Sequence, residues 1–323
     1  MWGVENRFPG HFCVHDSRMP LRIPLPEGLG PQFSVRAGLA AGAAPGRLNG
    51  ADLERPFWGV RAAAGTASDV HGLARAYSPR MRPRAFFSHL TAARLWNIPL
   101  PLDLQHDLPL HVSVPDPQRA VEGRLIIGHR LQVGMLDLRM NAGLPVTSLE
   151  RTVLDLAPML DDERLLGAID NILWWRRGAG SRATPASIAD ALSRYLGRRG
   201  MARFIRLLPL ATPRSDSGPE SAFRLRFIRA GFPVPVPNQN IYDANGQFVA
   251  MPDLQFTKYR MAFDYEGDHH RTDSQQWRKD LRRVPALEDA RWHHTRLSAD
   301  DLADPRYILT RTRRLLVERG WRQ

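Results

Sequence analysis

The sequence contains one cysteine and two lysines among its 323 residues. Because Cys13 stands alone, an internal disulfide is impossible and a metal site built from thiolates is excluded. Such low cysteine usage fits the reducing cytoplasm. The N-terminus lacks the continuous apolar segment of a signal peptide, and no segment approaches about 18 uninterrupted apolar residues. We therefore expect a soluble cytoplasmic protein that has no membrane partner.

The charge of the chain is strongly basic. Lysine and arginine exceed aspartate and glutamate by 45 to 33, and only Lys258 and Lys279 among the basic residues are lysines. Such an excess favours a polyanionic partner such as DNA, although charge alone indicates non-specific affinity rather than recognition of a base sequence. The length leaves room for two domains and a small third one.

Changes in composition suggest where the domains begin and end. Residues 1–18 differ in composition from the rest of the chain, and Met19 begins the phrase M-P-L-R-I-P-L-P, which fits translation starting at Met19. We expect residues 1–32 to be a disordered leader. The polar segment T-P-R-S-D-S-G-P at 212–219 is rich in proline, serine and glycine, which favours a linker or a domain boundary. The predicted units are therefore 33–63, 84–210 and 215–323.

The first unit has the outline of a minimal winged helix-turn-helix. The pattern predicts a helix from Phe33 to Leu39, a turn, a second helical turn from Leu48 to Leu53, and a strand from Pro56 to Arg61. Arg47 and Asn49 would then lie where a recognition helix presents polar groups to DNA. The alternative is an ordinary helical hairpin without DNA contacts.

The middle unit is predicted to mix strands and helices. Ser88 should cap a helix that runs to Trp96, and alternating residues predict strands at Leu110–Pro115 and Gly123–His129. The segment Leu144–Ala157 should begin a helix capped by Thr147 or Ser148. A catalytic triad could be sought among these polar residues, but no G-x-S-x-G elbow is present, so we favour caps and a buried ion pair between Arg151 and Asp155.

A helical stretch is predicted from Asp162 to Leu210, with a loop at Arg176–Pro185. Trp174 and Trp175 are typical of core or interdomain packing, and base stacking is the alternative.

Four acidic residues in the last third of the chain are spaced as in a metal-dependent nuclease. They are Glu220 in S-G-P-E-S-A-F-R, Asp253 in P-D-L-Q-F, and Asp264 and Glu266 in F-D-Y-E-G. Asp264 and Glu266 alternate along a strand and so share one face of it. Carboxylates that converge repel one another unless a cation lies between them, and Mg²⁺ prefers such oxygen ligands. The alternative is that each acid is a solvated surface charge.

Basic and polar residues come soon after the acids. The helix predicted at Gln275–Arg283 places Gln276, Lys279, Asp280 and Arg283 on one broad side at helical spacing. We expect Arg271, Gln276, Lys279 and Arg283 to contact phosphates, with Asp280 in a structural role. A solvated helix face is the alternative.

Two segments resemble known families. Residues 215–303 resemble the very-short-patch-repair-like branch of the PD-(D/E)XK restriction-endonuclease-like superfamily, through M-P-D-L-Q-F, F-D-Y-E-G-D-H-H-R and the helix W-R-K-D-L-R-R. Residues 33–63 and 86–157 resemble the AbiEi-type antitoxin architecture, through S-H-L-T-A-A and V-T-S-L-E-R-T-V-L-D-L-A. Together the two resemblances imply a multi-domain α/β protein: a minimal winged helix, a small α/β domain, and an α/β/α endonuclease-like core with a mixed sheet.

The endonuclease resemblance also implies roles for the acids. Asp253 and Asp264 would bind the metal, Glu220 would complete the site, and Glu266 stands where the family carries its catalytic lysine. Glu266 would then act as a metal ligand or as a carboxylate base. His269 and His270 occupy positions where the family has histidines that contact metal-bound water or phosphate, so His270 joins the catalytic candidates.

Two functions therefore remain open. One is a DNA endonuclease that uses Mg²⁺ or Mn²⁺, with Asp253, Asp264 and Glu266 as metal ligands. The other is an AbiEi-like antitoxin and transcriptional regulator, with a cognate toxin as partner and a nuclease fold that does not catalyse. The intact acid set favours the enzyme, whereas the missing lysine and the antitoxin-like N-terminal half favour the regulator.

Overall fold

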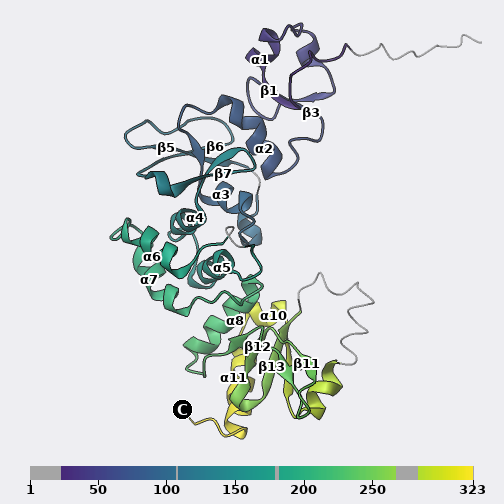
Figure 1. Ribbon diagram of the computed structural model, residues 1–323, viewed down its shortest axis with the longest axis vertical. Helices are drawn as coiled ribbons and strands as arrows, with labels where there is room; N and C mark the ends of the chain where they lie inside the picture. Colours follow the sequence, from purple (N-terminus) through teal and green to yellow (C-terminus); the bar gives the residue numbers. More distant parts are fainter. Residues whose placement is uncertain (1–22, 107, 179–181, 267–282, 323) are drawn as a thin grey trace, which may run out of the picture.

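The computed structural model describes residues 23–106, 108–178, 182–266 and 283–322. The chain forms a small N-terminal unit, a central α/β unit, a layer of helices and a C-terminal α/β unit, which succeed one another along the long axis of the molecule (Figure 1). The protein is thus of the mixed α/β class. Within the described ranges, no helix has the length and apolar character that a membrane crossing needs.

The N-terminal unit is a three-stranded antiparallel sheet with a short helix and a helical turn. Its elements are β1 (Gln32–Ser34), α1 (Val35–Ala40), η1 (Arg47–Asn49), β2 (Leu53–Glu54) and β3 (Val60–Ala63), with sheet order β1-β3-β2. The Ser34 side chain accepts a hydrogen bond from the amide of Ala37 and thereby caps α1. A core of Phe33, Leu48 and Leu53 holds the unit together.

Several predictions for this unit need correction. The first helix begins at Val35 rather than Phe33, because Phe33 pairs with Arg61 in the sheet. The second predicted helical turn is the single 3₁₀ turn η1, which ends at Asn49. The predicted strand begins at Val60, since the chain turns through Gly59 at a φ of +71°.

The predicted leader is also too long. Leu25 and Leu29 pack against the core of the N-terminal unit, and the Arg47 Nε–H donates to the carbonyl oxygen of Ile23. Residues 23–32 therefore belong to the folded unit, because their leucines bury apolar surface there. Residues 1–22 lie outside the described part of the chain.

The central unit contains a mixed five-stranded sheet with the order β6-β5-β4-β8-β7. Its strands are β4 (Phe86–Phe87), β5 (Leu110–Pro115), β6 (Ile126–Leu131), β7 (Leu138–Asn141) and β8 (Leu144–Thr147). Its helices are α2 (Val70–Tyr77), α3 (His89–Leu95) and α4 (Leu149–Leu156), with the 3₁₀ turns η2 (Ser78–Arg80), η3 (Leu102–Leu104) and η4 (Met135–Asp137). Strand β5 runs parallel to β6 and antiparallel to β4.

Most local predictions for this unit are confirmed. The strand at Leu110–Pro115 has the predicted bounds. Ser88 occupies the N-cap position of α3, but its side chain makes no capping hydrogen bond, because its Oγ lies 2.6 Å from Ser113 Oγ and 2.8 Å from His89 Nδ1; the predicted side-chain cap is therefore wrong. The buried pair also forms, with 2.8 Å between Arg151 Nε and Asp155 Oδ1. Two bounds differ: β6 begins at Ile126, and the segment 144–147 is a strand because it pairs with β7, so the helix starts only after the cap Ser148.

The helical layer consists of α5 (Asp162–Leu173), α6 (Pro185–Ser193), α7 (Met201–Leu207) and the turn η5 (Leu208–Leu210). These helices share a core with α4 that includes Leu165, Ile169, Ile172 and Phe204. The predicted loop between Arg176 and Pro185 is confirmed for its described residues. Trp174 lies at the edge of the layer, where its Nε1–H donates to Asp216 Oδ1 at 2.7 Å.

The segment at 212–219 is a packed junction rather than a free linker. Buried Asp170 of α5 accepts hydrogen bonds from the Thr212 amide at 2.7 Å, from Ser221 Oγ at 2.7 Å and from Arg224 Nη2 at 2.8 Å. Ser221 and Arg224 belong to α8 (Gly218–Arg229), so this carboxylate fastens α8 to α5. The polar composition of the segment thus reflects hydrogen bonds to protein rather than to solvent.

The C-terminal unit has a four-stranded mixed sheet with the order β14-β13-β12-β9. Its elements after α8 are β9 (Val236–Pro237), β10 (Ile241–Tyr242), β11 (Phe248–Ala250), β12 (Leu254–Phe256), η6 (Thr257–Tyr259), β13 (Met261–Tyr265), the helical residues 283–289, β14 (His293–Leu297), α10 (Ala299–Ala303) and α11 (Arg306–Glu318). Phe263 packs on one face of the sheet against Phe227 of α8 and Leu316 of α11. Ala262 packs on the other face against Leu287, so helical segments cover both faces.

Candidate functional site

Two carboxylates face each other at one end of the C-terminal sheet. Strands β12 and β13 are antiparallel with Leu254 opposite Phe263, so the next position outward places Asp253 opposite Asp264. The Asp253 amide donates to Asp264 Oδ1 at 3.1 Å, and the Tyr265 amide donates to Asp253 Oδ2 at 2.7 Å. Both side chains therefore lie on the same side of the sheet.

Glu220 lies beside Asp253 at the start of α8. Its Oε2 accepts hydrogen bonds from the Asp216 amide at 2.9 Å and from Asn238 Nδ2 at 2.7 Å, and the residue is only 5% exposed. Burial, followed by the negative charge of Asp253, raises the pKa of Glu220 to about 7. Glu220 can therefore exchange a proton near neutral pH.

Asp253 and Asp264 differ in their electrostatic environment. Burial, followed by the charge of Asp264, raises the pKa of Asp253 to about 6. Burial alone would raise the pKa of Asp264. The hydrogen bond from His294 and the positive charge of Arg283 outweigh this effect, so the pKa of Asp264 is lowered. Asp264 is thus an anion held by cationic and hydrogen-bonding partners, whereas the charge of Asp253 is incompletely compensated.

The partners of Asp264 come from elements distant in sequence. Arg283 Nη2 lies 2.7 Å from Asp264 Oδ1 and 3.0 Å from the Met251 carbonyl oxygen. On the other side, His294 Nε2 of β14 lies 2.7 Å from Asp264 Oδ2. Sequence analysis assigned Arg283 to phosphate binding and gave His294 no role. Strand β14 runs parallel to β13, with His294 beside Ala262 and Arg296 beside Asp264. Because Ala262 and Asp264 are two positions apart, His294 lies on the same face of the sheet as Asp264. The alternation of residues in W-H-H-T-R is the sequence pattern that could have predicted this placement of His294.

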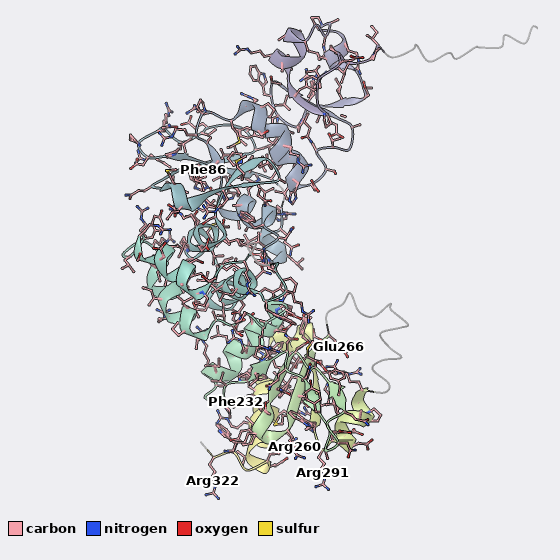
Figure 2. The ribbon with its side chains drawn as sticks, in the orientation of Figure 1. Phe86, Phe232, Arg260, Glu266, Arg291 and Arg322 are labelled. Atoms are coloured by element: carbon pink, nitrogen blue, oxygen red, sulfur yellow. The ribbon has the colours of Figure 1, made fainter. Side chains whose placement is uncertain are left out.

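Glu266 lies apart from the other acids. Its carboxylate is about half exposed and pairs with Arg296, with 3.0 Å between Arg296 Nε and Glu266 Oε1. Figure 2 places Glu266 at the end of the C-terminal unit nearer the helical layer, and Arg260 and Arg291 at the far end. Among the described residues, no three carboxylates bring their oxygens within 4.8 Å of one another; the one group of potential ligands that does so consists of three histidines. The four acids therefore do not form a single coordination sphere, and the close pair is Asp253 with Asp264.

Several other predicted site residues cannot be placed. His269, His270, Arg271, Gln276 and Lys279 lie outside the described residues.

The predicted DNA contacts of the N-terminal unit are engaged within that unit. Arg47 Nη2 lies 2.7 Å from Asp52 Oδ2, and its side chain is 10% exposed. The side-chain oxygen of Asn49 accepts hydrogen bonds from Arg55 at 3.1 Å and from Arg61 at 3.3 Å. Contact of Arg47 with a base would require its ion pair with Asp52 to open.

Comparison with known proteins gives two relatives and no family. No protein-family model matches the chain, and no solved structure matches it. The chain is similar to two proteins of Mycobacterium tuberculosis, uncharacterized protein MT2308 of strain CDC 1551 / Oshkosh and uncharacterized protein Rv2248 of strain ATCC 25618 / H37Rv. Each is 26% identical over 250 residues, which cover 77% of this chain and 87% of the relative. The similarity thus extends over most of the length of both relatives.

Proposed function

We propose that the protein binds DNA and that its C-terminal unit hydrolyses DNA phosphodiesters with Mg²⁺ or Mn²⁺. The observation that carries the proposal is the facing pair of Asp253 and Asp264, with buried Glu220 beside Asp253. The resemblance of F-D-Y-E-G-D-H-H-R to the very-short-patch-repair-like endonucleases supports the same function and an endonuclease-like core for this unit.

The donor set fits a hard divalent cation. Mg²⁺ usually takes only one or two protein carboxylates and keeps several waters, so Asp253 and Asp264 are sufficient as protein ligands. Burial, followed by the charge of Asp264, raises the pKa of Asp253 despite the positive charge of Arg283, so its ionised form is incompletely compensated and a bound cation would stabilise it. When bound there, such an ion would lower the pKa of a water molecule and polarise a phosphodiester.

The residues around the pair would transfer a proton and orient the metal ligands. Glu220, with a pKa of about 7, is suited to accept a proton from the attacking water at neutral pH. Arg283 and His294 hold Asp264 in one orientation through hydrogen bonds to its two oxygens. Glu266 would need to leave Arg296 before it could bind an ion or accept a proton.

Two observations favour the second candidate, an AbiEi-like regulator whose nuclease fold does not catalyse. Both carboxylate oxygens of Asp264 already have hydrogen-bond partners, Arg283 and His294, without a bound metal ion. In addition, Glu266 stands in the position of the family's lysine and is paired with Arg296. In this function the N-terminal unit would bind an operator through Arg47 and Asn49, and a cognate toxin would be the partner.

Cleavage of supercoiled plasmid by the purified full-length chain separates the two functions. We expect nicking or linearisation with Mg²⁺ or Mn²⁺ and none with chelator. Asp253→Asn keeps the shape of the side chain and removes its charge, so the rate should drop at least about a hundredfold, equal to about 2.7 kcal/mol in barrier. DNA binding should persist, because one less negative charge reduces repulsion of the phosphates.

Exposed Asp289 provides the matched control, since Asp289→Asn removes the same charge away from the pair. Its cleavage rate should equal that of the wild type. Absence of cleavage with either metal, together with binding to a defined operator that Arg47→Ala abolishes, would establish the regulator instead.

A further inference from the structure

Three histidines meet in the central unit, remote in sequence from the acid pair. His89 is the first residue of α3, His111 lies on β5 and His129 lies on β6. Strands β5 and β6 are parallel, with Ser113 opposite His129, so His111 and His129 project from the same face two positions apart. The Ser88 amide donates to the His111 carbonyl oxygen at 3.2 Å, which brings the start of α3 to the same place.

The three imidazoles are close enough to share one ion. One ring nitrogen from each residue lies within 4.8 Å of the other two, and His111 Nδ1 is 3.0 Å from His129 Nε2. A tetrahedral ion about 2.0–2.1 Å from each nitrogen requires nitrogens about 3.3 Å apart. Small rotations of the rings would therefore complete the arrangement.

The backbone and a serine pair orient His89. Its φ of +49° lies in the left-handed region, which non-glycine residues rarely adopt and which recurs at functional sites. Ser88 Oγ lies 2.8 Å from His89 Nδ1 and 2.6 Å from Ser113 Oγ. This hydrogen bond occupies Nδ1 and leaves Nε2 of His89 for a ligand, in the way that partners of metal-binding histidines fix the ring.

The electrostatic environment keeps all three rings neutral at neutral pH. Burial, followed by the other two rings, lowers the pKa of His89 to about 2, and burial, followed by His129, lowers the pKa of His111 to about 4. Burial likewise lowers the pKa of His129. Neutral imidazole is the form that binds metals, so protons do not compete there.

We propose that His89, His111 and His129 form a binding site for one divalent transition-metal ion of the zinc class. Three nitrogen ligands leave a fourth position for water or an anion, as in zinc sites with three protein ligands. Imidazole suits zinc, copper, iron and nickel, whereas Mg²⁺ prefers oxygen, so this site is distinct in chemistry and place from the acid pair. The inference does not depend on the proposed nuclease function.

Calorimetric titration with ZnCl₂ tests the site on the full-length chain. The protein is freed of its purification tag and of bound metal, and Cys13→Ser is present in every sample to remove the only thiol. We expect one zinc per chain, bound at submicromolar concentration and not displaced by millimolar Mg²⁺. His111→Gln and His129→Asn should each weaken binding at least about a hundredfold, because each removes one of only three ligands.

Two controls make the result specific. His106→Asn changes an exposed histidine outside the trio and should leave the affinity unchanged. Asp253→Asn should also leave it unchanged, so a failed nuclease assay and a failed zinc site are distinguishable. The proposal is overturned if the wild type does not bind zinc, or if His106→Asn weakens binding as much as the trio variants do.

A spectroscopic measurement covers variants that fail to fold. If a trio variant loses the circular dichroism signal of the wild type, X-ray absorption of the zinc-loaded wild type decides instead. Three histidine nitrogens around the ion support the site, and fewer than three refute it.

Discussion

Replacing Asp253 with asparagine should stabilise the metal-free C-terminal unit at neutral pH. The pKa of Asp253 is raised from 3.8 to about 6, and each pKa unit corresponds to about 1.36 kcal/mol, so ionising it in the folded state costs up to about 3 kcal/mol. Discounted for partial exposure, the expected gain is about 2 kcal/mol. The asparagine carbonyl can still accept the Tyr265 amide, so that hydrogen bond is retained.

The direction of the pH dependence is set by the raised pKa. The folded state holds the Asp253 proton more tightly than the unfolded chain does, so stability is lost as the pH rises from about 4 through about 6. Asp253→Asn removes this loss of stability. The variant should therefore be only slightly more stable than the wild type near pH 4, and the full gain in stability should appear near pH 8. Glu220, with its pKa raised from 4.5 to about 7, adds a further loss in the same direction. Because the two carboxyls interact, their losses do not simply add.

Hydrogen exchange of the β12 and β13 amides is the suitable assay, because it reports the C-terminal unit separately from the rest of the chain. Wild type and variant are compared at each pH in chelator, and again with Mg²⁺. Mg²⁺ should restore protection to the wild type and not to Asp253→Asn, since a ligand stabilises only the state that binds it. Asp289→Asn, an exposed control, should show no gain. A gain that is equal near pH 4 and pH 8, or the absence of a gain near pH 8, would refute the reasoning.

Three further predictions concern the junction, DNA and the histidine site. Asp170→Ala should destabilise the protein by about 3–5 kcal/mol in urea unfolding, because it leaves the buried charge of Arg224 unpaired; a loss below about 1 kcal/mol would contradict a buried pair. DNA affinity, measured by fluorescence anisotropy, should fall at least about tenfold between about 50 and 200 mM salt, and a flat profile would argue against phosphate contacts. Ser88→Ala should lower zinc affinity about 10- to 100-fold through the orientation of His89, and an unchanged affinity would remove Ser88 from the site.

Sequence reasoning predicted best where a pattern is local. The strand at 110–115 and the Arg151–Asp155 pair depend on alternation and on helical spacing, which neighbouring residues determine. It failed where a distant partner decides the structure. Phe33 joins a strand because β3 pairs with it. The segment at 212–219, predicted as a linker or a domain boundary, does separate the helical layer from the C-terminal unit, but it is packed rather than free, and the Thr212 amide donates to Asp170.

The candidate site shows the same division. The facing arrangement of Asp253 and Asp264 results from adjacent antiparallel strands and was within reach of the sequence. The hydrogen-bond donors to Asp264 could not be predicted from the sequence, because Arg283 and His294 belong to separate elements. The histidine trio was missed for the same reason: its members lie on three elements that only the sheet order brings together.

Helix α8 serves two units at once. Its first turn carries Glu220, which lies beside Asp253, and Ser221; Ser221 and Arg224, three residues further on, both donate hydrogen bonds to Asp170 of α5. A fragment that begins at residue 215 would therefore expose the buried guanidinium of Arg224 and loosen the helix that positions Glu220. An excised C-terminal fragment would therefore change the surroundings of the acid pair, because it removes the helical layer to which α8, the helix that carries Glu220, is bonded.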